Sequence, residues 1–465
     1  MTHASTTLLD AAAAALHIPP TATRGVTLYG DGVLTSAFPV TDFAAEAIGA
    51  AGLAVGQLRE ALFERRSSVV VDRRLASLWF GQSIQPVGWT LPAARDPITG
   101  DYPTSDGWIR LHTNAARHKA AALDALQCGG DPPDVASRVA RWSGEELEAA
   151  IVGQGGCAAA MRTGDAWLTH PQGRAVAAEP LVAFASMPAL AGSTSSGWRP
   201  EPGRPLAGLR VLDLTRVLAG PVATRFLAGY GAEVLRIDHP GWDEPGLVPD
   251  VTLGKRCARL DLHAAGGRDI FERLLSQADI LVHGYRPGAL ERLGYAEEAR
   301  RGINPGIIDV SLDAYGWTGP WRERRGFDSL VQMSSGIAHA GMQWRRADRP
   351  VPLPVQAIDH ATGYLMAAAV VRSLQWRVAE GRTTTAKLSL AATAHSLLAL
   401  PRIATMAAMA DDSGSRGADY QASLEQTEWG PAKRCRSPLL VNDVPLTWQY
   451  PSSGLGTAEP MWRGA

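Results

Sequence analysis

Apolar runs alternate with helical patterns over residues 208–312, and this alternation constrains the fold more than any other feature of the sequence. GLRVLDL (208–214), AEVLRID (232–238), DILVHG (279–284) and GIIDVSL (306–312) predict buried strands, and the segments between them predict helices. Strands that alternate with helices form βαβ units around a parallel sheet. We therefore expect an α/β fold, with a Rossmann-like doubly wound parallel sheet in a large domain and a second, smaller α/β domain.

Composition divides the chain into five segments. AGSTSSGWRPEPGRP (191–205) is rich in Ser, Gly and Pro and predicts a linker. It separates a small α/β domain (86–190) from the large domain (206–410). Residues 1–85 predict a helix, a strand and a helix that partly repeat the large domain. The polar, Pro- and Gly-rich tail (411–465) is expected to wrap the surface.

The overall charge favours neither nucleic acid nor a membrane as a partner. The formal net charge is −1, so no global field attracts an anionic polymer or lipid surface. No apolar stretch reaches the roughly 20 residues that span a bilayer. The first residues lack a basic region and resemble no signal peptide, which predicts a cytoplasmic protein. The four cysteines are scattered without a CxxC pair, which argues against a zinc site or a disulfide framework: Cys128, Cys157, Cys257 and Cys435.

One acid, Asp359, precedes a helical pattern of small and apolar residues in VQAIDHATGYLMAA (355–368). Asp42 has a similar place in FPVTDFAAEAIGAAG (38–52). Both acids are followed by a helix, a charged turn and a strand of nearly the same lengths, which predicts an internal duplication. Taken alone, Asp359 fits an ordinary helix N-cap.

Several common enzyme classes lack their motifs here. The turn after the first strand, LTRVLAGPVATRF (214–226), has no GxGxxG, although Asp238 at the end of the second strand suits a ribose contact. A nicotinamide enzyme is therefore a weak alternative. No GxSxG elbow, P-loop or HExxH pattern is present.

Seven motifs between residues 205 and 400 together resemble the family III CoA transferases, the CaiB/BaiF type that includes formyl-CoA and carnitine-CoA transferases. They are PLAGLRVLDLTRVLAGPVAT, GAEVLRID, GKRCARLDL, ADILVHGYRPGALERLG, INPGIIDVSLDAYGWTGPW, GFDSLVQMSSG and AIDHATG, in that order. Through this resemblance Asp359 corresponds to the family's catalytic aspartate.

The resemblance implies an acyl-CoA:carboxylate CoA transferase. A carboxylate nucleophile attacks a thioester to form an aspartyl mixed anhydride, and the returning thiolate gives an aspartyl-CoA thioester. Backbone N–H groups at the helix start are expected to stabilise the Asp359 carboxylate. Coenzyme A or acyl-CoA is then a substrate, with a carboxylic acid as acceptor and no metal or tightly bound cofactor. The family assembles as interlocked dimers, so we expect a homodimer that retains or replaces this arrangement.

The resemblance also implies a set of coenzyme A contacts. The loop of Arg216, Val217, Leu218 and Ala219 would lie against the thioester and pantetheine. Phosphates call for arginine, lysine and free backbone amides. The basic residues that follow the predicted strands are the candidates for phosphate contacts: Arg236, Lys255, Arg256, Arg286 and Arg292.

Two other activities remain open. α-Methylacyl-CoA racemases of the same superfamily use a histidine with the aspartate, but Phe327 takes the place of that histidine, and His339 and His360 fall at other motif positions. A non-catalytic CoA-binding paralogue is the other alternative, since Gly284 replaces the usual asparagine and no covering glycine loop is evident near DPITGDYP (96–103).

The order of the domains departs from the family pattern. Segments resembling the family's small domain, 102–126 and 155–182, lie upstream of the large domain instead of after the catalytic aspartate. The first half of the chain thus resembles the back half of one transferase, and residues 205–400 resemble the front half of another. This order predicts Asp359 as the working nucleophile and Asp42 as its relic.

Overall fold

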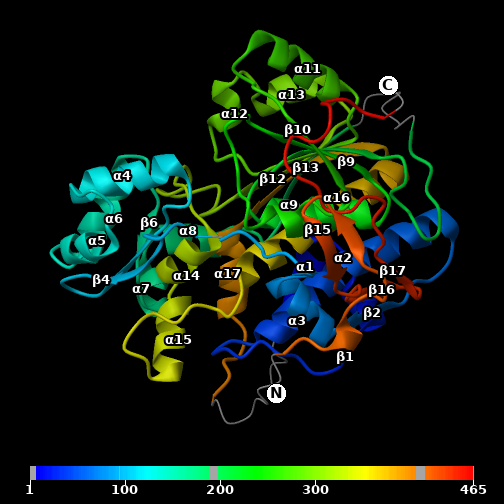
Figure 1. Cartoon of the computed structure of the whole chain (residues 1–465). Helices are drawn as coiled ribbons and strands as arrows, with labels where there is room; N and C mark the ends of the chain where they lie inside the picture. Colours follow the sequence, from blue (N-terminus) through cyan, green and yellow to red (C-terminus); the bar gives the residue numbers. More distant parts are fainter. Residues whose placement is uncertain (1–6, 94, 189–196, 405–413, 464–465) are drawn as a thin grey trace.

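The computed structural model describes residues 7–93, 95–188, 197–404 and 414–463 (Figure 1). A small α/β domain lies to one side of a large body in which a seven-stranded sheet is covered by helices. The predicted linker 191–205 and tail 411–465 lie partly outside the described residues.

The large sheet has the strand order of a doubly wound fold. Its order is β10-β9-β8-β11-β12-β13-β7, and all neighbours are parallel except β7, which pairs antiparallel with β13. The strands are β7 (Ala183–Pro188), β8 (Arg210–Leu214), β9 (Glu233–Asp238), β10 (Lys255–Arg259), β11 (Ile280–His283), β12 (Ile308–Asp313) and β13 (Arg382–Ser389). In chain order the six parallel strands run 3-2-1-4-5-6 across the sheet, which confirms the expected Rossmann-like α/β fold.

Helices cover both faces of this sheet, which explains its continuous apolar strands. Val211 of β8 packs in one core with α9 and α16, whereas its neighbour Leu212 faces a second core with α11. The helices of this domain are α9 (Ala219–Gly229), α10 (Val248–Val251), α11 (Ala265–Ser276), α12 (Ala289–Arg292), α13 (Glu297–Ile303), α14 (Asp328–Ser334), α15 (Ile337–Arg345), α16 (Ala357–Glu380) and α17 (Leu390–Leu398).

The small domain has its own antiparallel sheet and core. The strands β4 (Gly100–Pro103), β5 (Trp108–Leu111) and β6 (Ala158–Ala160) pair in that order. Its helices are α4 (Ala116–Leu126), α5 (Pro132–Val139) and α6 (Gly144–Gly153). The next two helices, α7 (Gly164–Thr169) and α8 (Pro171–Ala178), bury Trp167 and Val176 in the core of the large domain. Cys157 and Ala159 pack against Leu330 and Met333 of α14, so the small domain contacts the large domain directly.

The N-terminal segment and the tail build a shared layer. β1 (Val26–Tyr29) and β2 (Val69–Asp72) are parallel, and β16 (Leu439–Val441) of the tail pairs antiparallel with β2. β15 (Gly430–Arg434) joins β3 (Ile84–Pro86) to β14 (Glu425–Thr427). The remaining elements are α1 (Leu8–Ala15), η1 (Pro20–Gly25), α2 (Val40–Phe63), α3 (Arg73–Gly81), η3 (Gly417–Asp419) and β17 (Val444–Pro445).

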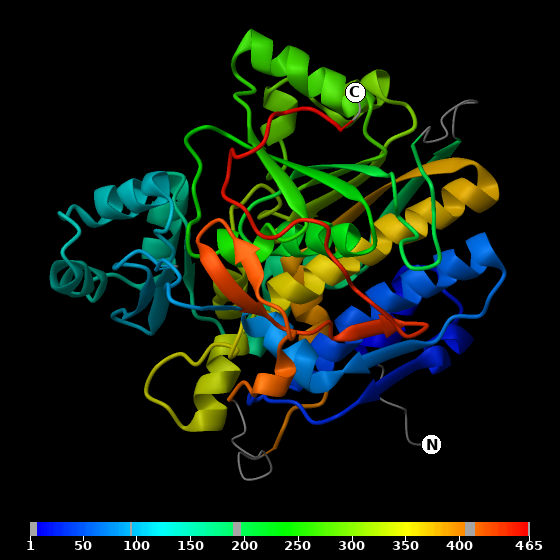
Figure 2. The same ribbon diagram turned by 45° about the vertical axis from the view of Figure 1, so that its right-hand side comes forward.

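Helices α2 and α16 share their geometry as well as their pattern. Each is 24 residues long, has its aspartate at the third position, and ends in a left-handed C-cap. The preceding residues, Pro39 (φ −75°, ψ 62°) and Gln356 (φ −73°, ψ 64°), have nearly the same conformation. Figure 2 shows α2, in blue, alongside α16, in gold. Each is followed by a strand and then by a helix whose N-cap side chain, Asp72 or Ser389, accepts backbone hydrogen bonds.

Arg434 anchors the tail inside the protein. Its fully buried guanidinium pairs with Asp250 at 2.9 Å and with Glu425 at 2.8 Å. It also donates to Ser83 Oγ at 2.8 Å and to Ser452 Oγ at 3.0 Å. The tail therefore enters the core instead of only wrapping the surface.

We expect Arg434→Ala to lower the free energy of unfolding by about 3–5 kcal/mol, because it leaves the largely covered Glu425 carboxylate without its partner. Urea denaturation followed by circular dichroism measures this loss. Lys433→Ala removes a neighbouring exposed cation and should change stability by less than about 0.5 kcal/mol. Equal effects of the two substitutions would contradict the anchoring role.

Candidate active site

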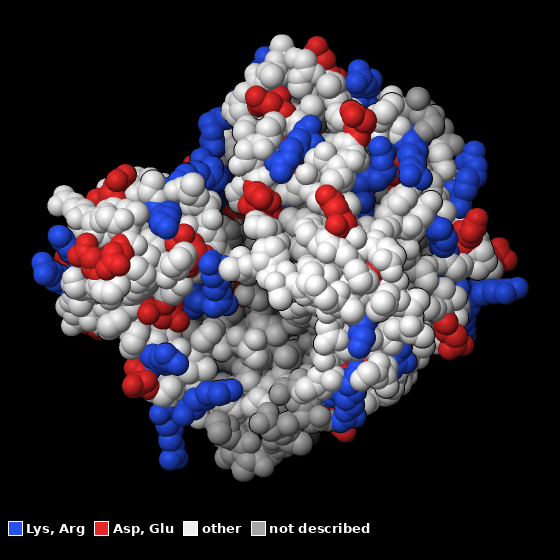
Figure 3. Space-filling view, viewed as in Figure 1, with Lys and Arg blue, Asp and Glu red and all other residues white. Residues whose placement is uncertain are grey.

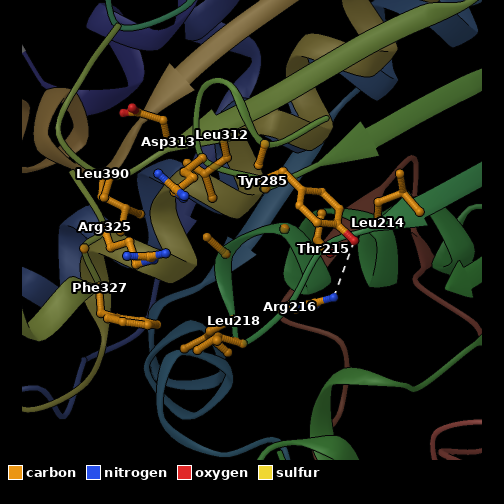
Figure 4. A pocket seen from close by; sticks show the side chains of 18 of the residues that line it. Leu214, Thr215, Arg216, Leu218, Tyr285, Leu312, Asp313, Arg325, Phe327 and Leu390 are labelled. Carbon is orange, nitrogen blue, oxygen red and sulfur yellow. Dashed lines mark hydrogen bonds between the residues drawn. The ribbon is translucent and has the colours of Figure 1, made fainter. Parts of the chain in front are cut away.

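A cavity of about 480 Å³ opens at the carboxyl ends of β8, β11 and β12. The strand order reverses between β8 and β11, and such switch points are where open α/β sheets bind ligands. In Figure 4, Arg325, Phe327 and Leu390 lie along one side of the cavity, and Leu214, Thr215 and Tyr285 along the other.

The loop after β8 forms one wall in a strained conformation. Val217 has a φ of 65°, which a β-branched residue rarely adopts. Its amide donates to Glu244 Oε2 at 2.8 Å, and this bond holds the loop open toward the cavity. Arg216, Val217, Leu218 and Ala219 all line the cavity, and their contact with a thioester and pantetheine stays a prediction.

Arg216 is held between two aromatic rings. Its guanidinium lies 4.6 Å from the Trp242 ring centre and 5.4 Å from that of Tyr285. It also donates to the Tyr285 hydroxyl at 3.4 Å (Figure 4). Stacking on rings leaves much of the guanidinium edge free to bind an anion or a planar group.

Asp359 lies in the first turn of α16 and lines the same cavity. Its residue is 7 % exposed, so the carboxyl group is buried but reaches the cavity. One turn later, a Cβ on Gly363 would collide with the carbonyl oxygen of Ala219. Glycine at this position lets α16 and α9 approach closely, which brings Asp359 next to the strained loop.

A second buried carboxyl group, Asp328, occupies the start of α16. Its Oδ2 accepts the backbone N–H of Asp359 at 2.9 Å, and Gln332 donates to its Oδ1. The sequence predicted that amides at this helix start would stabilise the Asp359 carboxylate. In the structure the amide of residue 359 donates to Asp328 instead.

Burial and the neighbouring charge act on the pKa of Asp359 in the same direction. Desolvation is the main cause that raises its pKa well above the usual range, and the Asp328 carboxylate raises it further. Burial also raises the pKa of Asp328, although hydrogen bonds from backbone amides and Gln332 oppose this shift. Asp359 therefore keeps its proton to higher pH than an ordinary aspartate.

Besides Arg216, four arginines without a carboxylate partner among the described residues border the cavity. Arg286 and Arg292 were expected from the sequence, whereas Arg117 and Arg325 were not. Within the described residues, none of the four forms an ion pair. Arg325 lies in the basic run RERR before the GFDS motif, which was the available signal; Arg117 comes from the distant small domain.

Three of the basic residues expected at the phosphates do not line the cavity. Arg236 is fully buried and pairs with Asp238 at 2.8 Å and with Glu244. Lys255 is also buried and pairs with Asp213 at 3.1 Å, while Arg256 pairs with Glu233 at 3.4 Å. Glu244 accepts hydrogen bonds from both the Val217 amide and Arg236, so Arg236 helps to fix the loop through Glu244.

The histidines near the motif positions have different surroundings. Phe327 lines the cavity, and its ring stacks on His112 at 3.8 Å between centroids. His360 faces away from the cavity and stacks on Phe80, and burial lowers its pKa to about 3. Gly284 borders the cavity, and a Cβ there would meet nothing within 4 Å. Glycine in place of the usual asparagine therefore leaves open space in the cavity.

Comparisons with known proteins show similarity to one family of transferases. The sequence model of CoA-transferase family III matches residues 206–425. The chain is 34% identical over 195 residues to the probable fatty acyl-CoA transferase Rv3272 of Mycobacterium tuberculosis, covering 39% of this chain and 49% of that protein. It is 29% identical over 262 residues to the succinyl-CoA–L-malate CoA-transferase alpha subunit of Chloroflexus aurantiacus, covering 53% and 54%.

A crystal structure of Rv3272, in its orthorhombic form, aligns with 33% identity and a TM-score of 0.39. The alignment covers 42% of this chain and 58% of that one. The chain spans about half the length of the curated relatives that it matches. No helix in the described ranges has the length and apolar character needed to cross a bilayer.

We expect Asp328→Asn to lower the pKa of Asp359, because it removes the negative charge that opposes ionisation of that carboxyl group. The titration of the carboxyl carbons in the aspartate-labelled protein, followed by ¹³C NMR, measures this shift. Asp313 is a useful internal control, since burial and Glu179 raise its pKa and Asp328 does not. An unchanged or higher midpoint for Asp359 would contradict the coupling.

Proposed function

We propose that this chain, whose residues 206–425 belong to CoA-transferase family III, is an acyl-CoA:carboxylate CoA transferase with Asp359 as its nucleophile. One observation carries the proposal: a buried carboxyl group without a charged partner reaches a cavity at the switch point of a doubly wound sheet. Such a carboxyl group can accept an acyl group while little water competes for it.

The reaction proceeds in four balanced steps. The Asp359 carboxylate attacks the thioester carbonyl; a C–O bond forms, the C–S bond breaks, and coenzyme A leaves as thiolate. The thiolate attacks the aspartyl carbonyl of the mixed anhydride and releases the donor acid. The acceptor carboxylate attacks the resulting aspartyl-CoA thioester and expels the thiolate again. The thiolate finally attacks the acceptor's acyl carbon, which yields the new acyl-CoA and frees the Asp359 carboxylate.

The raised pKa of Asp359 has two opposite consequences. A carboxylate that few hydrogen bonds stabilise is more reactive toward a carbonyl, but a smaller fraction of it is ionised at a given pH. Only the ionised form attacks the thioester. Activity at low substrate concentration should therefore rise with pH through the pKa of Asp359.

The cavity residues divide into two proposed roles for coenzyme A. The loop from Arg216 to Ala219 lies against the pantetheine and thioester, and Arg286 and Arg292 contact phosphates. We assign Arg236, Lys255 and Arg256 a supporting role, because their charges are already paired away from the cavity. Coenzyme A enters and leaves as substrate, and the proposal includes no resident metal or cofactor.

We propose that Asp42 is the relic of a second nucleophile. It pairs with Arg73 at 2.7 Å, its side chain is 49% exposed, and it does not line the cavity. Among the described residues before α2, β1 is the one strand, in place of the strand-and-loop half that surrounds Asp359. The packing of α2 on α16 supports a pseudo-dimer built from one chain. Homodimerisation and a cytoplasmic location stay predictions.

We expect Asp359→Ala to reduce exchange of coenzyme A between acids by roughly 10³-fold or more, because the group that accepts the acyl is lost. Exchange is measured with a panel of acyl-CoAs and labelled acids. Mass spectrometry of the wild-type protein should detect an acyl or CoA adduct that hydroxylamine removes. Binding without any adduct would favour the non-catalytic alternative, and α-deuterium exchange without an acceptor acid would favour the racemase.

We expect Asp42→Ala to change exchange by less than about 3-fold, because a half-exposed ion pair contributes little. Its cost in stability should be below about 1 kcal/mol. The same exchange assay and a thermal scan measure both effects beside Asp359→Ala. If Asp42→Ala alone abolishes exchange, the roles of the two acids are reversed.

A further inference from the structure

His118 is a buried polar side chain that has no partner and borders the cavity. It lies in the first turn of α4 in the small domain, and its residue is 2 % exposed. Neither ring nitrogen forms a hydrogen bond within the described residues. Burial lowers the pKa of His118 to about 4, so at neutral pH the ring is uncharged and offers one N–H donor. Buried polar groups are normally hydrogen-bonded, so the missing partner points to a ligand.

Two arginines beside His118 lack a counter-charge. Arg117 precedes it on the same turn, and Arg325 lies on the opposing segment of the large domain. Burial is the main cause that lowers the pKa of Arg325, and the positive charge of Arg117 lowers it further. Since like charges repel unless an anion lies between them, this pair favours a negatively charged ligand.

Contacts between the two domains hold this wall in place. Arg325 donates to the Gly155 carbonyl at 2.9 Å, and Arg324 pairs with Glu148 at 2.8 Å. The edge of His118 packs on the Phe327 ring, with 5.9 Å between centroids. Phe327 directly precedes Asp328, whose carboxylate accepts the amide of Asp359. His118 is therefore linked to the start of α16 through Phe327 and Asp328.

We propose that Arg117, His118 and Arg325 form an oxyanion subsite of the cavity, assembled from both domains. It binds a substrate oxyanion that is not the reacting group: either the far carboxylate of a dicarboxylic acyl group or a phosphate of coenzyme A. The arginines supply charge, and the imidazole supplies a buried N–H donor. The subsite rests on the proposed function, because that function identifies the cavity's occupant.

Binding measurements distinguish the two anions without requiring turnover. Isothermal titration uses four thioesters: succinyl-CoA, butyryl-CoA, and the succinyl and butyryl thioesters of pantetheine, which lacks phosphate. If the subsite binds a carboxylate, Arg117→Ala weakens binding of both succinyl thioesters about 10- to 100-fold and leaves both butyryl thioesters unchanged. If it binds a phosphate, the same variant weakens both CoA thioesters and neither pantetheine thioester.

Two variants test His118 itself. His118→Phe keeps a ring against Phe327 but removes the N–H donor, and it should weaken the same thioesters about 5- to 50-fold. His118→Gln keeps a donor and should restore part of that loss. The control is Arg141→Ala, which removes an exposed arginine of the same domain that does not line the cavity and should match the wild type. Thermal scans verify that each variant is folded.

Two results would overturn the proposal in different ways. If the wild type binds the thioesters but Arg117→Ala and His118→Phe bind them equally well, the subsite is absent and the proposed function stands. Equal weakening of all four thioesters would also overturn the subsite, because an anion contact cannot affect butyryl pantetheine. If the wild type binds none of the four, the proposed function fails and the subsite fails with it.

Discussion

The close packing at the start of α16 is the constraint on which the rest of the site depends. Glycine at position 363 lets α9 and α16 meet without a side chain between them, so the loop after β8 and Asp359 reach the same cavity. On its other side α16 packs on α2, a helix that is also rich in alanine and glycine. Small residues in both helices permit this contact. A larger side chain at position 363 would separate Asp359 from the loop.

The two carboxyl groups at the start of α16, Asp328 and Asp359, have different electrostatic surroundings. Asp328 accepts hydrogen bonds from backbone amides and from the Gln332 side chain, so the folded chain satisfies its oxygens. Asp359 receives no such support and lies where burial raises its pKa. The pair resembles other sites in which two nearby acids titrate at different pH because their environments differ. One acid positions the helix, and the other remains available for chemistry.

The small domain contributes residues to the cavity although it precedes the large domain in the chain. The small domain lies upstream in the chain, yet its helix α4 borders a cavity formed by loops that begin almost 100 residues later. β7 follows the small domain and joins the edge of the large sheet beside β13, while tail strand β16 joins β2. β7 and β16 therefore have equivalent places, because each pairs antiparallel with the strand that follows α16 or α2.

Surface charges of both signs are interspersed on the face shown in Figure 3, so neither sign dominates there.

The sequence alone determined the doubly wound sheet, its strands and helices, and the position of an acid at the start of α16, because these follow from local periodicity and from ordered motifs. It also located the loop from Arg216 to Ala219. It did not distinguish Arg286, which borders the cavity, from Arg236, which is buried in an ion pair, because both are arginines near strand ends. Only the tertiary structure brings Arg117 and His118 to this cavity, since that contact joins segments far apart in the chain. Burial, which decides whether a charge is paired or free to bind a ligand, depends on those distant contacts.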